Sequence, residues 1–249
     1  MALIRSIMSL IQTHPLSIID LRKEMRKRKA DIDEKKKSCK ILIIDDHVND
    51  EDYPLKDSIV YLRRTLMMDV RAVTDLDSFN EAANYDIIIS DVEGVGGKMG
   101  LPNGIDLIKR LNELYKDKLY AIMSQELFQF RSLKMGKEVG IWDKKEMKEA
   151  FRCSTSGTLE ERVLKMVDTY ADPAARWEVL RAGMLKNGMS IHDVAKLESA
   201  YVKSILNKDR SIYDKTVGKL DSPVYDNEER ILNYIKTAAS IISTIISLI

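Results

Sequence analysis

The stretch KILIIDD, residues 40–46, joins a short apolar run rich in β-branched residues to a pair of acids. Two similar runs follow it, YDIII at residues 85–89 and LYAIM at residues 119–123. Runs that are apolar on both faces are typical of central strands in a parallel sheet covered by helices. Residues 69–73 and 139–142 are weaker strand candidates, nearer a sheet edge. We therefore expect five strands.

Apolar residues at helical spacing separate these strands. The stripes lie within residues 55–66, 79–83, 105–114, 128–135 and 159–167. Strand and helix thus alternate five times between Lys40 and Tyr170. This alternation predicts an α/β domain whose parallel strands are joined by right-handed helical crossovers.

The pattern beyond Tyr170 is mostly helical. Asp172-Pro173 marks the boundary, because proline suits the first turn of a helix. A last helix follows the polar residues 221–223 and carries a wide apolar face from Ile231 to Leu248. Such a face does not stay exposed to water, so we expect it to pack in a core or to self-associate through a coiled-coil-like seam.

Composition bounds the class of protein. The 249 residues are 45% hydrophobic and 32% charged, which excludes wholesale disorder. Cys39 and Cys153 are too few for a disulfide framework or a zinc cluster, so a reduced, cytoplasmic protein is expected. No stretch reaches the ~20 apolar residues that a transmembrane helix needs.

Charge is unevenly distributed along the chain. Residues 1–38 hold ten Lys or Arg and five acids, a net charge of +5, which leaves −4 for the rest of a chain whose total is +1. The basic run Arg22–Lys37 is compatible with binding to nucleic acid or an anionic membrane. Its interspersed acids favour a solvated, charge-rich helix. Upstream of this run, a helical hairpin bent at His14-Pro15 is expected.

Polar side chains stand at the ends of four predicted strands. They are Asp45 and Asp46, Ser90 and Asp91, Ser124, and Asp143, Lys144 and Lys145. Ligands collect at the carboxyl ends of parallel strands, so these groups are expected to converge. Carboxylates that lie close together raise each other's pKa or recruit a cation, and Mg²⁺ prefers such oxygen ligands.

The same residues provide the parts that phosphoryl transfer needs. Asp91 can act as a nucleophile and become an aspartyl phosphate. Mg²⁺ and Lys144 can neutralise charge on the transferred oxygens, and Ser124 can donate a hydrogen bond to one of them.

Five separated positions then agree in order and spacing with one family. Over about half of its length, the chain resembles the receiver domain of bacterial two-component response regulators. The matching pieces are residues 40–46, residues 86–91, residues 101–108 (LPNGIDLI), Ser124 and Lys144.

This resemblance implies a flavodoxin-like, five-stranded parallel sheet in the order 2-1-3-4-5. It implies Asp91 as the phospho-acceptor, Ser124 as the hydroxyl switch and Lys144 as the phosphate-pairing lysine. It also implies that Mg²⁺ is bound by Asp45, Asp46, Asp91 and the backbone carbonyl of Glu93. The donor would be a histidine kinase or a phosphotransfer protein, and any enzymatic activity would be limited to autophosphatase activity.

On this interpretation the chain has three parts. Residues 1–38 form a basic, amphipathic helical arm, residues 39–170 a receiver-like domain, and residues 171–249 a helical output or oligomerisation region. Phosphorylation of Asp91 would switch the helical region, and the helical extensions would support a homo-oligomer.

Several positions depart from the family pattern. His47 follows the acid pair where a third acid is frequent, and Gln125 follows Ser124 where a small residue is preferred. Lys145 replaces the usual proline, so either lysine is a candidate, although spacing favours Lys144; a cis bond is not expected there. The switch aromatic is absent from Ile141, although Trp142 is adjacent. The glycine-rich loop of residues 92–100 is longer than usual and suggests a mobile lid.

Two other functions remain open. The first is a phosphate-independent interaction scaffold built on the same fold. The second is a DNA-binding regulator, because residues 188–205 weakly resemble a helix-turn-helix. The expected glycine turn is missing there, since residues 198–202 continue as helix, and basic residues do not gather on the presumed reading helix.

Overall fold

The computed structural model describes residues 16–125, 139–153, 157–220 and 228–247. The chain divides into two compact units. We call residues 30–176 the sheet unit, and residues up to Lys29 together with residues 177–249 the helical unit. The sheet unit encloses the predicted 39–170 domain. The predicted arm is shared, because α2 (Ile18–Lys27) belongs to the helical unit and α3 (Lys29–Ser38) lies almost wholly in the sheet unit.

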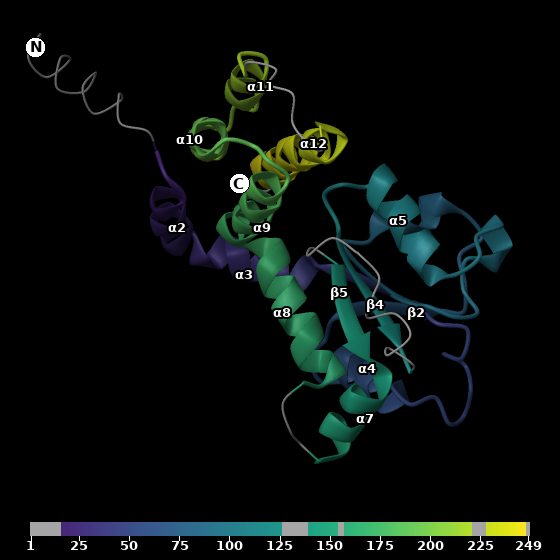
Figure 1. Cartoon of the computed structure of the whole chain (residues 1–249). Helices are drawn as coiled ribbons and strands as arrows, with labels where there is room; N and C mark the ends of the chain where they lie inside the picture. The colour runs from purple at the N-terminus through teal and green to yellow at the C-terminus, as the bar shows by residue number, and fades with distance from the viewer. Residues whose placement is uncertain (1–15, 126–138, 154–156, 221–227, 248–249) are drawn as a thin grey trace, which may run out of the picture. The chain divides into compact units, whose positions relative to one another are not determined.

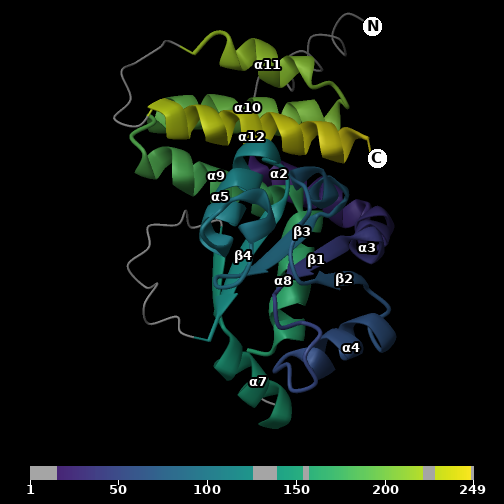
Figure 2. The same cartoon turned by 90° about the vertical axis from the view of Figure 1, so that its right-hand side faces the viewer.

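The sheet has five parallel strands in the order β2-β1-β3-β4-β5, which confirms the predicted α/β, flavodoxin-like fold (Figure 2). The strands are β1 (Lys40–Ile44), β2 (Asp69–Val73), β3 (Ile87–Asp91), β4 (Leu119–Ser124) and β5 (Val139–Asp143). Strand β3 starts two residues later than the apolar run suggests, and Ser90 and Asp91 are its last two residues. Every residue of β3 is buried, as expected for a central parallel strand.

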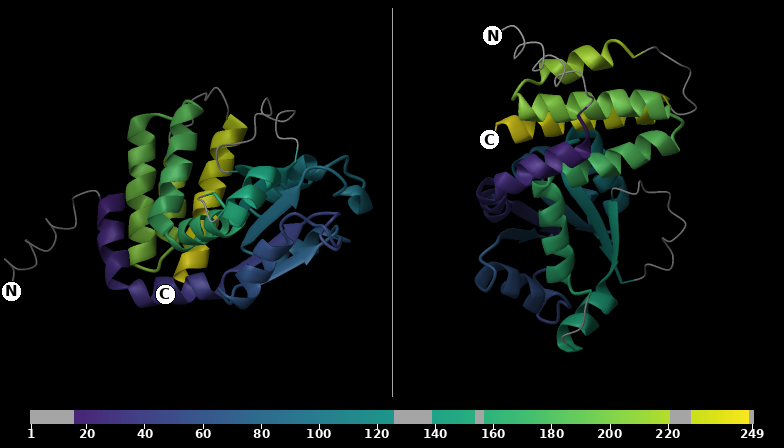
Figure 3. Two further views of the ribbon diagram at one scale, coloured as in Figure 1. Left: turned by 90° about the horizontal axis from the view of Figure 1, so that it is seen from below. Right: turned by 90° about the vertical axis from the view of Figure 1, so that its left-hand side faces the viewer.

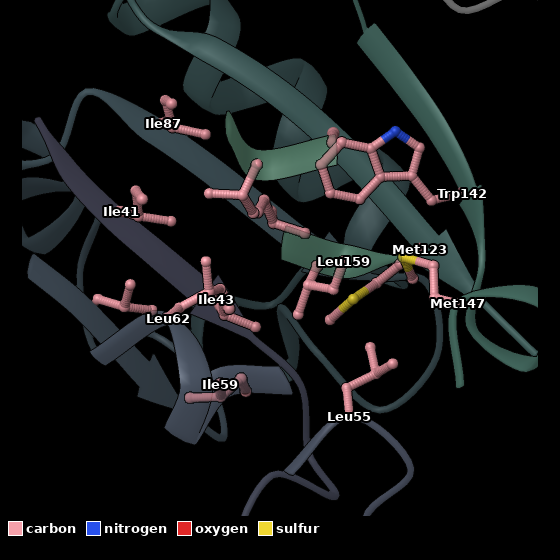
Figure 4. Packing of buried hydrophobic residues seen from close by; sticks show 14 of the residues in the cluster. Ile41, Ile43, Leu55, Ile59, Leu62, Ile87, Met123, Trp142, Met147 and Leu159 are labelled. Atoms are coloured by element: carbon pink, nitrogen blue, oxygen red, sulfur yellow. The ribbon is translucent and has the colours of Figure 1, made fainter. Parts of the chain in front are cut away.

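Two apolar cores cover the two faces of the sheet. On one face, alternate strand residues such as Ile41 and Ile89 pack with α4 (Lys56–Arg64), α7 (Lys144–Cys153) and α8 (Leu159–Ala171), as Figure 4 shows for part of this cluster. On the other face, Leu42 and Ile88 pack with η1 (Phe79–Asn84) and α5 (Gly104–Leu114). The strands between the two layers are therefore held from both sides.

Local sequence accounts for where several helices begin. The Asn103 side chain accepts hydrogen bonds from the amides of Ile105 and Asp106, which caps α5. Thr158 accepts from the amide of Glu161 and caps α8 in the same way. The short 79–83 stripe forms the 3₁₀ helix η1, and a second 3₁₀ turn, η2 (Gly97–Met99), lies in the glycine-rich loop.

The helical unit is organised around α10 (Ile191–Leu206). This helix contacts α2, α11 (Ser211–Val217) and α12 (Glu228–Ile246) (Figure 1). Helix α9 begins at Pro173, as predicted, and runs to Lys186. Helix α12, yellow in Figure 3, buries a wide apolar face within the unit, so core packing accounts for the pattern of the last helix.

A single carboxylate ties three helices of this unit together. The Oε1 atom of Glu198 accepts a hydrogen bond from the amide of Ile18, at 3.2 Å, and its Oε2 atom accepts from the Trp177 indole, at 2.9 Å. The Trp177 ring in turn lies 4.8 Å from the Tyr201 ring, measured between centroids. Helices α2, α9 and α10 are thus joined by polar as well as apolar contacts.

Helix α10 is continuous from Ile191 to Leu206, so residues 198–202 continue as helix, as the sequence indicates. The turn before it lies at Gly188, whose φ is 91°. The predicted helix over residues 128–135 and the hairpin bend at His14-Pro15 lie outside the described residues. Among the helices that are described, none is both long enough and apolar enough to cross a membrane.

Candidate functional site

Strand register brings the predicted site residues to one edge of the sheet. Ile44 of β1 pairs with Ser90 of β3, so Asp45 and Asp91 follow side by side. Asp91 itself pairs with Met123 of β4. Ser124 is the next residue along β4, and it pairs with Asp143 at the end of β5. The carboxyl edge of the sheet therefore carries acids from β1 and β3 together with Ser124, as the sequence predicts.

Asp45, Asp46 and Asp91 form an acidic cluster suited to a metal ion. One carboxylate oxygen from each lies within 4.8 Å of the others. Asp45 is fully buried, and Asp91 is nearly so. The Oδ1 atom of Asp46 is buried and has no hydrogen-bond partner, which leaves an oxygen with its lone pairs unused. An all-oxygen donor set with an unsatisfied carboxylate fits a hard divalent cation such as Mg²⁺.

Lys144 is the positive charge that faces this cluster. Its Nζ lies 2.6 Å from Oδ2 of Asp91 and 2.7 Å from Oδ2 of Asp45, and its side chain is only 2% exposed. Lys144 is the first residue of α7, whose next amides, those of Lys145 and Glu146, donate to the Asp143 carboxylate. The Lys145 side chain is exposed. Of the two candidate lysines, Lys144 is the one that reaches the acids.

Burial dominates the electrostatics of Asp91. Desolvation raises the pKa of its carboxyl to about 6, against the opposing attraction of Lys144, and the nearby Asp45 adds to the rise. Oδ1 of Asp91 accepts a hydrogen bond from the amide of Val92, at 2.7 Å. The Asp91 carboxylate is therefore held at both oxygens, by the Val92 amide at Oδ1 and by Lys144 at Oδ2.

The sequence did not reveal a partner of Asp45. The buried Tyr53 hydroxyl donates to Oδ2 of Asp45 at 2.8 Å, the same oxygen that Lys144 contacts. Burial, followed by the charge of Asp45, raises the pKa of Tyr53, so its hydroxyl stays protonated and acts as the donor. Tyr53 precedes α4 in a loop without a strong periodic pattern, which is why no sequence signal pointed to it.

Ser124 and Glu93 complete the predicted set. Ser124 is buried at the end of β4. Glu93 lies two residues beyond Asp91 and is exposed. The sequence-based roles of the Ser124 hydroxyl and of the Glu93 carbonyl stay predictions.

A cavity of about 480 Å³ opens beside Lys144. Its walls come from the loop after β1, from the end of β4 and from α7, with these lining residues: His47, Asp50, Asp52, Tyr53, Pro54, Gln125, Lys144, Lys145 and Lys148. The exposed His47 ring lies with Nδ1 2.7 Å from Asp50 and Nε2 3.7 Å from Asp46. The hydrogen bond to Asp50 is the main cause that raises the pKa of His47.

The glycine-rich loop of residues 92–100 contacts the rest of the sheet unit at several points, and its role as a mobile lid stays a prediction. Val92 and Val95 are buried in the core under α5. The amide of Gly104 donates to the Val92 carbonyl at 2.8 Å. A Cβ at Gly104 would lie 1.7 Å from the carbonyl oxygen of Asp91, so only glycine permits this approach of α5 to β3.

Trp142 does not take the position that the family gives its switch aromatic. Its ring is buried in the core shared with Met147 of α7, whereas Ile141 is 41% exposed. The described residues contain no cis peptide bond, which agrees with the expectation for Lys144-Lys145.

Comparison with known proteins does not assign the chain to a family. No protein-family model matches the chain, and a search of curated proteins found no matching sequence.

Proposed function

We propose that the chain is a phosphorylation-controlled signalling protein of the receiver type, in which Asp91 accepts a phosphoryl group. Asp45, Asp46, Asp91 and the backbone carbonyl of Glu93 would hold Mg²⁺. The donor would be the phosphohistidine of a histidine kinase or a phosphotransfer protein. This proposal rests on the residue resemblance and on the chemistry of the site.

One observation carries the proposal. The buried ammonium of Lys144 contacts both Asp45 and Asp91, at 2.7 and 2.6 Å, within a cluster of three carboxylates at the carboxyl edge of a 2-1-3-4-5 sheet. Burying the two acids Asp45 and Asp91 together with a lysine is costly for a protein that uses them only for stability, because desolvation of ion pairs outweighs much of their attraction. Such a cost is typical of functional sites.

The chemistry follows from the atoms on this edge. A carboxylate oxygen of Asp91 attacks the phosphorus of a phosphohistidine, the P–N bond breaks as the new P–O bond forms, and the released imidazole takes up a proton. Lys144 and Ser124 would pair with the added phosphoryl oxygens. A bound Mg²⁺ would supply further neutralisation of their charge.

Intact-mass spectrometry after incubation with acetyl phosphate and Mg²⁺ tests this proposal. We expect one phosphoryl adduct on the wild type and none on Asp91→Asn. Asp57→Asn is a matched control, because Asp57 is an exposed aspartate in the first turn of α4. An unmodified wild type, or an adduct that persists in Asp91→Asn, would contradict the proposal.

The scaffold alternative makes the opposite prediction. It expects neither Mg²⁺ affinity nor an adduct, and unchanged partner binding in Asp91→Ala. A DNA-binding regulator would instead bind duplex DNA with an affinity that falls steeply with salt.

A further inference from the structure

Asp75 lies outside the acidic cluster and makes contacts that the proposed chemistry does not use. It follows β2, and its Oδ1 accepts hydrogen bonds from the amides of Leu76 and Gly96, both at 2.8 Å. Its Oδ2 accepts from the amide of Lys98 at 3.1 Å. One carboxylate thus joins the loop after β2 to the glycine-rich loop after β3. We call these three hydrogen bonds the Asp75 bridge.

The bridged loop lies directly against a proposed cation ligand. A Cβ built on Gly94 would lie 1.9 Å from Oδ2 of Asp46, and the φ of Gly94 is +70°. The backbone at Gly94 therefore packs directly against the Asp46 carboxylate. Only the buried Val95 separates Gly94 from Gly96, so the Asp75 bridge restrains the loop two residues from its contact with Asp46.

The loop position therefore controls two proposed ligands. The loop packs against the Asp46 carboxylate, nearest to Oδ2, and the other oxygen of that carboxylate is the buried, unpartnered Oδ1. The loop also contains Glu93, the residue before Gly94. Removing a group that orients a metal ligand without touching the metal typically weakens metal affinity 10- to 100-fold. Because the buried Val95 also restrains the loop, the lower end of that range applies.

We propose that Asp75 is a positioning residue for divalent-cation binding at Asp45, Asp46 and Asp91. It holds the 92–100 loop against Asp46 without touching the ion. This inference rests on the proposed function, because it assumes that the acidic cluster binds Mg²⁺.

Isothermal titration of the full chain with MgCl₂ tests the inference. We expect Asp75→Ala to weaken Mg²⁺ binding about tenfold relative to wild type. Asp75→Asn should fall between the two, because its one amide oxygen can still accept from Gly96. Asp77→Asn is the matched control: it removes the exposed Lys98–Asp77 ion pair, 2.7 Å long, and leaves the Asp75 bridge intact. Its affinity should stay within about twofold of wild type.

A second measurement reports the bridge without any metal. Amide hydrogen exchange at Gly96 and Lys98, followed by NMR in chelator, should accelerate at least tenfold in Asp75→Ala and not in Asp77→Asn. If Asp75→Ala does not fold, Asp75→Asn provides both readouts, with faster exchange at Lys98 and a weaker affinity.

The outcomes separate this inference from the function on which it rests. Equal Mg²⁺ affinity in wild type and the Asp75 variants, or unchanged exchange at Gly96 and Lys98, overturns the role of Asp75 and leaves the cation site standing. A wild type that binds no Mg²⁺ overturns the proposed function and this inference together.

Discussion

Among the described residues, the sheet unit buries five charged side chains, whereas the buried polar groups of the helical unit are the uncharged Asn187 and Ser204. These two complete backbone hydrogen bonds: Asn187 donates to the Gly183 carbonyl and Ser204 accepts from the Tyr213 amide. In the sheet unit, Asp45, Asp91 and Lys144 instead contact one another at the strand ends. Buried charge needs a compensating partner, so the strand ends of the sheet unit depend on electrostatic contacts, in addition to the apolar packing that both units share.

Packing in the helical unit is tested most strongly at Tyr201. Tyr201 is fully buried in α10 and stacks on Trp177. Tyr201→Ala should lower the free energy of unfolding of the helical unit by about 4 kcal/mol, because it leaves a cavity. Urea denaturation followed by circular dichroism measures this change. Ile191→Ala in the same helix is the control, since Ile191 is 77% exposed and its truncation should cost little.

The electrostatic side is tested by Lys144→Met, which removes the ammonium and keeps an aliphatic stem. In metal-free buffer it should destabilise the sheet unit by about 3 kcal/mol, because two carboxylates are left buried without a counter-charge. Millimolar Mg²⁺ should recover part of that loss. Denaturation with and without Mg²⁺ measures both effects. Lys145→Met, at an exposed position, should have no comparable effect, and equal losses in the two variants would refute the role of Lys144.

Loss of the Glu198 carboxylate should have a smaller effect on the stability of the helical unit. Glu198→Gln should cost about 1 kcal/mol, because the amide oxygen can replace only one of the two acceptors that serve Ile18 and Trp177. Mg²⁺ should not recover this loss. The same denaturation series provides the measurement, and recovery by Mg²⁺ would show that the two units are not electrostatically distinct.

The buried Cys39 thiol should not react with an alkylating reagent in the folded chain. Burial raises the pKa of the Cys39 thiol to about 12, so almost no thiolate forms at pH 8. In a Cys153→Ser background, iodoacetamide should leave the folded chain unmodified and label it after denaturation in urea. Rapid labelling of the native chain would show that the core beneath β1 opens readily.

The strand ends explain how much of this structure could be predicted. The apolar runs identify the strands and so predict the fold class. Asp45-Asp46, Asp91 and Ser124 stand at the carboxyl ends of these runs, so the acidic cluster can also be predicted from the sequence around each strand. Spacing already favoured Lys144 over Lys145, and the contacts of Lys144 with Asp45 and Asp91 agree with that preference.

Other features depend on contacts between distant segments, which local pattern does not contain. Asp75 bonds to Gly96 and Lys98, more than 20 positions away, and Tyr53 reaches Asp45 from an irregular loop. Glu198 accepts a hydrogen bond from the amide of Ile18, 180 positions away in the sequence, and α2 belongs to the same unit as the C-terminal helices. The glycine-rich loop suggested mobility because glycine allows backbone freedom, whereas at Gly94, and at Gly104 just beyond the loop, a Cβ would overlap a neighbouring atom.

Gly104 and Gly97 make that last distinction concrete for anyone diversifying the chain. A saturation library at 104 should return glycine almost alone, since even one methyl group would overlap the Asp91 carbonyl oxygen. A Cβ at position 97 would have no neighbouring atom within 4 Å, so this position should accept many amino acids. Distant relatives that keep the acids should therefore be sought by the glycine at 104, whereas position 97 should vary among them.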